Sequence, residues 1–221
     1  MPYGRGRSKD ASGVADVLLG GWDIGGIYNA RSGLPINLLI TRPDILYRDT
    51  TTGAYFNNPS AGRVAVINTP GGGNSRNVRR PDLVTGVDPF INDGGLLFLN
   101  PAAFATPLPG TFGNLERNSL HGPNFNQVDM VISKHFGGAR NFEFRTEIFN
   151  LFNTANFSNP NATLPNALPT AALTEANKVQ PGQPFSTASA TSAFGALTST
   201  VGRTVGLGTA RQIQFAFRVN F

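Results

Sequence analysis

The last eleven residues alternate strictly between apolar and polar side chains. In "RQIQFAFRVNF", residues 211–221, the apolar positions are Ile213, Phe215, Phe217, Val219 and Phe221. The residues between them are Gln, Ala, Arg and Asn. Alternation with a period of two is typical of a β-strand whose two faces meet different surroundings. The segment is therefore predicted to be a strand with one apolar and one polar face.

Four further segments alternate in the same way. We expect strands at 20–31, 34–40, 126–136 and 140–150. The last of these also fits an amphipathic helix, on which Ile148, Phe149 and Phe152 would lie together. The alternation before Ile148 and the asparagines that follow it favour a strand with a turn after it, near residues 150–154.

The connections between these segments are either very short or very long. Short turns are expected at Ser32–Gly33 and at Gly137–Ala139. The long connections, 41–125 and 151–210, are rich in Asn, Pro, Gly, Thr and Ala. Loops of this length are uncommon in compact soluble domains. They are normal in transmembrane β-barrels, which have short periplasmic turns and longer extracellular loops.

A descending terminal strand fixes the direction of the others. Counting backward from it, both short turns fall on the periplasmic side and both long loops fall outside. The sequence therefore predicts an all-β fold for residues 1–221: a partial antiparallel transmembrane β-barrel, about five strands of a larger barrel, with long extracellular loops. A soluble β-sandwich also alternates, but it buries its apolar face and has shorter loops.

The alternation assigns side chains to the two faces of such a barrel wall. The residues expected to face lipid are Phe142, Phe144, Ile148, Phe215, Phe217 and Val219. Those expected to face the lumen are Asp129, Glu143, Arg145, Glu147 and Arg218. Lys134 falls on the lipid face near the end of its strand, from where a long side chain could reach the headgroups.

The lumen-facing charges allow two interpretations. Glu143, Arg145 and Glu147 could contact a solute in the lumen. They could also form an electrostatic ladder with Asp129 and Arg218 on the neighbouring strands, at under about 1 kcal/mol per pair. We favour the ladder, because alternating charges on adjacent strands need no ligand to explain them.

Composition narrows the function classes. Charged residues make up 14% of the chain, against roughly 25% in soluble domains. The net charge of +5 is scattered along the chain, so no basic groove for nucleic acid is indicated. The chain has no cysteine, which excludes disulfides and thiol catalysis. No continuous apolar run reaches the roughly 18 residues of a membrane helix, and the first residues do not read as a signal peptide.

No enzymatic chemistry is indicated. The two histidines, His121 and His135, are not accompanied by a nucleophile motif. The glycines at 71–73 lack the Lys-Ser/Thr of a phosphate-binding loop. We therefore expect neither a catalytic site nor a cofactor or metal site.

Several ordered stretches resemble one protein family. They are "PYGRGR", "LLGGWDIGGIYNARSGLPINL", "RPDLVTG", "FLNPAAFATP", "GTFGNLERNSLHGPNFNQVDMVISKHF", "FEFRTEIFNLFNTANFSNPN", "FGALTSTV" and "RQIQFAFRVNF". In this order they resemble the C-terminal end of TonB-dependent outer-membrane receptors of the Oar-like group, which carry a carboxypeptidase-regulatory-like domain upstream.

The resemblance implies a plugged barrel of about 22 strands that imports a solute whose identity the sequence does not reveal. It implies that Phe221 is part of the signal read by the barrel-assembly machinery, and that the partners are outer-membrane lipid and the remainder of the receptor. About five strands cannot close a barrel of at least about 8, so we expect a fragment that does not transport by itself. An alternative is an extracellular β-sheet module that binds a glycan or peptide with its Asn/Pro-rich loops.

Overall fold

The structure is a computed structural model that describes residues 13–70, 79–136, 141–202 and 208–220. The chain divides into two compact units. The sheet unit contains residues 1–33, 123–158 and 199–221, and the loop unit contains residues 34–122 and 159–198. Each unit is described separately below.

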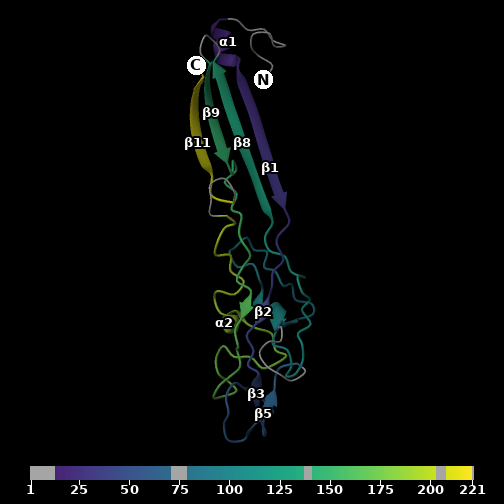
Figure 1. Cartoon of the computed structure of the whole chain (residues 1–221). Helices are drawn as coiled ribbons and strands as arrows, with labels where there is room; N and C mark the ends of the chain where they lie inside the picture. Colours follow the sequence, from purple (N-terminus) through teal and green to yellow (C-terminus); the bar gives the residue numbers. More distant parts are fainter. Residues whose placement is uncertain (1–12, 71–78, 137–140, 203–207, 221) are drawn as a thin grey trace. The chain divides into compact units, whose positions relative to one another are not determined.

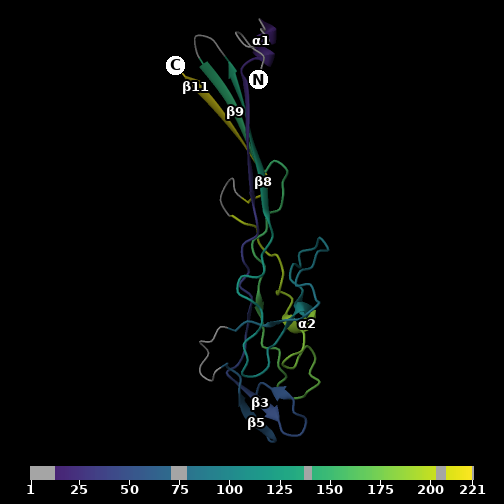
Figure 2. The same cartoon turned by 90° about the vertical axis from the view of Figure 1, so that its right-hand side faces the viewer.

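The sheet unit is built on four long antiparallel strands (Figure 1). They are β1 (Trp22–Arg31), β8 (Phe125–Phe136), β9 (Asn141–Phe149) and β11 (Gln212–Asn220), in the order β1-β8-β9-β11. A short helix, α1 (Val14–Leu19), precedes β1. Figure 2 shows β9 and β11 turning away from β1 and β8, so the sheet is curved. The order leaves β1 and β11 as the two edges.

Residues 141–149 form a strand, so the helical alternative for this segment is wrong. β9 pairs along its length with β11 and over seven positions with β8. It ends in a turn in which Asn150 and Asn153 both have a φ of 52°, a conformation that asparagine tolerates well. The Asn150 side chain donates to the carbonyls of Thr154 at 3.0 Å and Thr209 at 2.8 Å, which closes the strand end.

The strand expected at 34–40 does not belong to this sheet. Its residues lie in the loop unit, where only β2 (Leu39–Ile40) and a single bridge from Pro35 to His121 form. The alternation is present, but its apolar residues Ile36, Leu38 and Ile40 point into a buried core at 2–3% exposure. A partly extended segment against a core has the same period-two pattern as a strand at a membrane.

Without a strand at 34–40 in the sheet, β1 runs opposite to the direction that the sequence predicted. Because β1 pairs directly with β8 in antiparallel register, the four strands alternate up, down, up and down. The Ser32–Gly33 segment follows the end of β1 at which both long connections leave the sheet, so the expectation that both short turns lie at the same end of the sheet is wrong. The contrast in loop length remains, because only four residues separate β8 from β9. Those residues include the expected Gly137–Ala139 turn and lie outside the described residues.

The loop unit has short elements joined by irregular chain. They are β2, β3 (Ile45–Asp49), β4 (Tyr55–Phe56), β5 (Arg63–Ile67), β6 (Asp82–Leu83), η1 (Pro101–Ala103), β7 (Phe104–Ala105), β10 (Thr163–Leu164) and α2 (Thr187–Ala190). Apart from the parallel β2–β10 pair, the strand pairs are antiparallel. The expected all-β, antiparallel fold class is thus confirmed, with four long strands in place of about five.

The two long connections share one hydrophobic core. Its buried side chains come from both segments of the loop unit and include Leu38, Leu99, Phe104, Leu164, Phe185 and Phe194. Phe104 and Phe194 meet edge to face, with ring centroids 5.9 Å apart. What the sequence shows as loops is therefore a packed unit with its own interior.

A buried arginine fastens the first segment of the loop unit. Arg42 is 7% exposed and donates to the Asn68 side chain at 2.7 Å and to the carbonyls of Leu108 and Thr111 at 3.1 Å each. Burial, and then the nearby Arg79, lower the pKa of the Arg42 guanidinium, while Asp82 opposes them. Arg42 thereby joins three stretches of chain and finds acceptors for a guanidinium that burial has removed from water.

Candidate membrane-facing sheet and loop cleft

The strand register puts the two predicted sets of side chains on opposite faces of the sheet. Phe144 is opposite Phe217, Phe142 is opposite Val219, and Ile148 is opposite Ile213. On the other face, Glu143 is opposite Arg218. Directly paired residues project to the same side of a sheet. The face that carries the phenylalanines is called the apolar face below, and the other the polar face.

The apolar face is covered with aromatic rings that remain accessible. Phe142 stacks on Phe217 and Phe144 stacks on Phe215, each with ring centroids 6.0 Å apart. Phe215 and Phe217 are nevertheless 69% and 65% exposed. A soluble sandwich would bury such a face against a second sheet. The described residues of the sheet unit supply no second sheet.

The polar face carries paired charges. Arg145 and Glu147 form an ion pair of 2.5 Å along β9, and His135 lies 3.3 Å from Asp23 across β8 and β1. Glu143 is the register partner of Arg218 on β11 and of His135 on β8. The two ion pairs and the register of Glu143 agree with an electrostatic ladder on this face.

Asp129 belongs to the polar face, on the same side of β8 as the register partners of Arg145 and Glu147, but its hydrogen bonds are not those of a charge ladder. Its carboxylate accepts from the Gln127 side chain and from the backbone N–H of Asn150, both at 2.8 Å. It therefore caps the end of β9 where the strand enters its turn. No sequence signal distinguishes this cap from a ladder position, because the partner is a backbone group 21 residues away.

Lys134 does not extend to the surface as expected. It lies on the apolar face opposite Trp22 and Phe144 and is only 5% exposed. Its ammonium donates to the carbonyl of Gly20 and sits 5.1 Å from the Trp22 ring and 5.5 Å from the Phe136 ring. Aromatic faces and a carbonyl stabilise the charge there.

The strand length matches a membrane crossing. The ten residues of β1 extend about 34 Å at about 3.4 Å each, and a tilt of about 35–45° reduces this to about 24–28 Å. The apolar band of outer-membrane barrels is about 25 Å tall. Trp22 and Tyr28 lie on the apolar face toward opposite ends of β1, where a barrel has its aromatic girdles.

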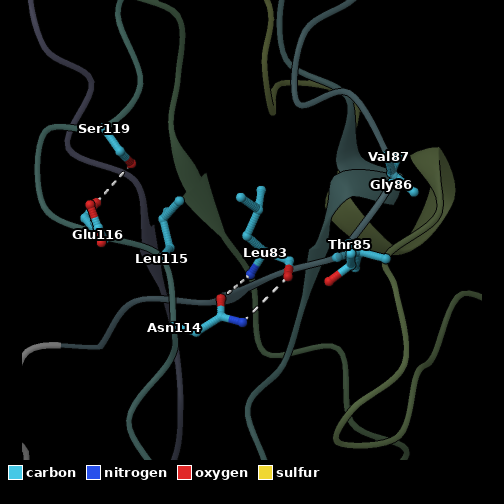
Figure 3. Close-up of a pocket in the computed structure, with 9 residues that line it drawn as sticks. Leu83, Thr85, Gly86, Val87, Asn114, Leu115, Glu116 and Ser119 are labelled. Carbon is cyan, nitrogen blue, oxygen red and sulfur yellow. Dashed lines mark hydrogen bonds between the residues drawn. The ribbon is translucent and has the colours of Figure 1, made fainter.

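The loop unit contains a cleft of about 550 Å³ (Figure 3). Leu83 and Leu115 contribute apolar side chains to its lining. In Figure 3, Glu116 and Ser119 lie on one side of these leucines, and Thr85, Gly86 and Val87 lie on the other.

Asn114 fixes the two sides of the cleft to each other. Its side-chain oxygen accepts from the N–H of Leu83 at 2.6 Å, and its own N–H donates to Asp82 at 2.9 Å. The cleft combines apolar surface with a few hydroxyl and carboxylate oxygens, a composition suited to a small ligand with both polar and apolar groups. The sequence resemblance included these residues, but nothing in their pattern predicted a cleft.

The remaining residues singled out by the sequence are His121 and Phe221. His121 pairs through its backbone with Pro35. Phe221 lies outside the described residues. Within the described ranges, no three His, Cys, Asp or Glu side chains gather as metal ligands, and no helix has the length and apolarity to cross a membrane.

Comparison with known proteins gives one family. The profile of the family described as "Outer membrane beta barrel domain" matches residues 1–214. Neither the curated proteins nor the solved structures contain a match. The matched range includes nearly the whole chain, so both the sheet unit and the loop unit fall within it.

Proposed function

We propose, from the premise that the chain belongs to the outer membrane beta barrel domain family, that it is the C-terminal barrel portion of a TonB-dependent receptor of the Oar-like group. The observation that carries the membrane part is the exposed apolar face opposite a charged polar face on four alternating strands. The receptor part is supported by the ordered resemblance of eight stretches of sequence. The protein acts in transport and not as an enzyme.

The sheet faces give each side a role in this proposal. The phenylalanine face contacts outer-membrane lipid, and Glu143, Arg145, Glu147 and Arg218 line the lumen. The loop unit lies outside, because both of its segments leave the end of the sheet opposite the four-residue β8–β9 connection. β1 and β11 expose unpaired backbone edges, which cannot persist in lipid. Further strands of the receptor pair with both edges.

The remaining partners follow from the same scheme. The barrel-assembly machinery inserts the chain and reads Phe221 as the terminal aromatic. A plug domain fills the barrel, and the inner-membrane energising complex acts on it. The imported solute first meets the loop unit, and nucleic acid has no part in this function.

Two experiments test the proposal at different levels. For the receptor, the reading frame upstream of Met1 is sequenced, with a plug and further alternating strands as the expected result. An upstream frame with neither feature contradicts the receptor. For the membrane, intact cells are treated with proteinase K. Cleavage within the loop unit and protection of the sheet strands β1, β8, β9 and β11 are expected, and cleavage within these strands contradicts the orientation.

The cleft favours a second candidate, the extracellular binding module for a glycan or peptide. Such a module needs no lipid, so replacing Phe215 by Arg should leave it secreted and binding. The receptor proposal expects the same variant to be lost from the outer membrane. Fractionation of cells that express the full chain separates the two functions, with Gln214→Arg on the polar face as the matched control.

A further inference from the structure

Helix α1 has its apolar side chains on the outside. Val14, Val17, Leu18 and Leu19 are 75%, 58%, 64% and 51% exposed, whereas Asp16 is half-buried. A helix on the surface of a soluble protein shows the opposite arrangement, with its apolar side against the core. No residue of α1 is buried. The helix therefore does not contribute to an interior of the sheet unit.

The end of α1 is nevertheless firmly attached to the sheet. The Trp22 indole N–H donates to the carbonyl of Leu18 at 2.8 Å, and the Lys134 ammonium donates to the carbonyl of Gly20. These two side chains hold both the last turn of the helix and the residue that follows it.

The next residue, Gly21, adds a backbone contact. Its carbonyl accepts from the His135 N–H at 2.8 Å. Its φ of 68°, together with the overlap that a Cβ would have with the His135 carbonyl, excludes other residues from this position. The position of α1 is thus set by β1 and β8, even though its apolar side chains contact little.

The side chains that hold the end of α1 belong to the apolar face of the sheet, so the exposed aliphatic residues of α1 adjoin that face. Trp22 and Lys134 are register partners on that face, at the end where α1 joins β1. Figure 1 shows α1 at the end of the sheet where β8 finishes and β9 starts. In the proposed function this is the periplasmic end, where the outer membrane presents a phospholipid leaflet.

We propose that α1 is an interfacial helix that inserts Val14, Val17 and Leu18 among the headgroups and upper acyl chains of the phospholipid leaflet. The inference rests on the proposed membrane position of the sheet. Aliphatic side chains that enter the leaflet boundary lose contact with water. A six-residue helix is too short to form by itself, so its attachment through Trp22, Gly21 and Lys134 is what makes insertion possible.

Lys134 has a specific part in this arrangement. An exposed ammonium on the apolar face would hold that end of the sheet in water. By donating to Gly20 and lying over the Trp22 ring, Lys134 satisfies its charge within the protein and positions the helix. The amphipathic indole of Trp22 suits the same interfacial level.

Single labels measure the depth of α1 directly, because the chain has no cysteine. Val17→Cys reports on α1, Phe215→Cys on the middle of the sheet and Val64→Cys, at a 50% exposed position of β5, on the loop unit. The full chain is extracted from outer membranes with its surrounding lipid in polymer-bounded discs. A nitroxide on each cysteine is then tested for collision with oxygen and with a water-soluble nickel complex.

The three labels separate this inference from the proposed function. We expect Phe215→Cys to be deep, Val64→Cys to be in water and Val17→Cys to be shallow but protected from nickel. If Val17→Cys behaves like Val64→Cys while Phe215→Cys stays deep, the inference is wrong and the membrane sheet stands. If Phe215→Cys is also in water, the proposed function itself is wrong. Spin–spin broadening at Val17→Cys would mean that α1 contacts a second copy of the chain and not lipid, which also contradicts the inference.

A charge variant gives a second readout. Val17→Asp with Leu18→Asp should expel the helix from the leaflet and shift the emission of Trp22, the only tryptophan, to longer wavelength. Val64→Asp is the control and should leave the emission unchanged. Unchanged emission in the double variant overturns the inference, provided that proteinase K still finds the sheet protected.

Discussion

The sheet unit and the loop unit treat the same kinds of side chain in opposite ways. In the sheet unit, Phe215 and Phe217 are more than three-fifths exposed. In the loop unit, Phe104 and Phe194 are 0% and 1% exposed and pack against each other. The loop unit thus has an apolar interior, whereas the sheet unit has a large exposed apolar face, which is unusual for a surface in contact with water.

The two units therefore differ in what stabilises their apolar side chains. Burial of apolar surface from water stabilises the loop unit by about 25 cal/mol per Å². The rings of the apolar face stack on one another but stay largely exposed, so in the proposed function lipid supplies the apolar contact that this face lacks. Removal of an aromatic ring should therefore be severe in the core of the loop unit, whereas on the apolar face the severe change should be the introduction of a charge.

The largest effect is expected in the core of the loop unit. Phe104→Ala removes a fully buried ring and should reduce the stability of this unit by about 3–5 kcal/mol. Phe112→Ala, at a 65% exposed position of the same unit, is the control and should have little effect. Urea unfolding followed by limited proteolysis of residues 34–122 measures both. Equal effects of the two variants would mean that burial of Phe104 does not stabilise the loop unit.

The next effect tests the apolar face of the sheet. Phe215→Arg puts a charge near the middle of β11 on that face and should cost about 2–4 kcal/mol in a membrane. Gln214→Arg puts the same charge opposite Glu147 on the polar face and should be tolerated. The measurement is the amount of each variant assembled in the outer membrane. If both assemble equally, the apolar face does not contact lipid.

A smaller effect is expected at the buried arginine. Arg42→Lys cannot reach the Asn68 side chain and the carbonyls of Leu108 and Thr111 at once, and should destabilise the loop unit by about 1–3 kcal/mol. Burial lowers the pKa of the Arg42 guanidinium and would act on a lysine in the same direction. Arg48→Lys, at an exposed position, is the control, and the unfolding midpoint in urea is the readout.

The sequence predicted the strands correctly where apolar and polar residues alternate along the whole length of a strand. The alternation located β1, β8, β9 and β11 within a residue or two, and the two predicted faces fall on opposite sides of the sheet. It could not distinguish Ile36, Leu38 and Ile40 from lipid-facing residues, because a core and a bilayer select the same side chains. Taking these residues into the sheet also reversed the direction of β1.

Other features were beyond sequence patterns for a different reason. The core of the loop unit joins residues from 36 to 194, and nothing local indicates which distant segments will meet. The bonds of Asp129 to Asn150 and of Lys134 to Gly20 likewise depend on backbone groups whose positions only the fold sets. The sequence patterns predicted which side chains lie on the apolar and polar faces of the sheet. They did not predict which side chains bind the backbone of another segment.

The smallest effect concerns one turn of the loop unit and appears only in acid. The Glu175 carboxylate accepts from the N–H groups of Ala171, Ala172 and Thr170 and from the Thr170 hydroxyl. These bonds, first that from Ala171 and then that from Ala172, lower the pKa of Glu175 from 4.5 to about 2. Because the folded pKa is the lower one, the stabilisation is complete above 4.5 and is lost as the pH falls toward 2.

The acid effect should stay local, because a second contact holds the same turn without titrating. Arg63 donates to the carbonyls of Thr170 at 3.1 Å and Ala171 at 3.0 Å. Hydrogen exchange of the amides of residues 170–172 should therefore accelerate, relative to intrinsic rates, between pH 4.5 and 2, whereas amides in β3 and β5 remain protected. In Glu175→Gln the protection should be weaker at neutral pH and no longer change with acid. If the amides of β3 and β5 lose protection together with this turn, the acid effect is not local, and the stability of the loop unit depends on the Glu175 contact at its surface.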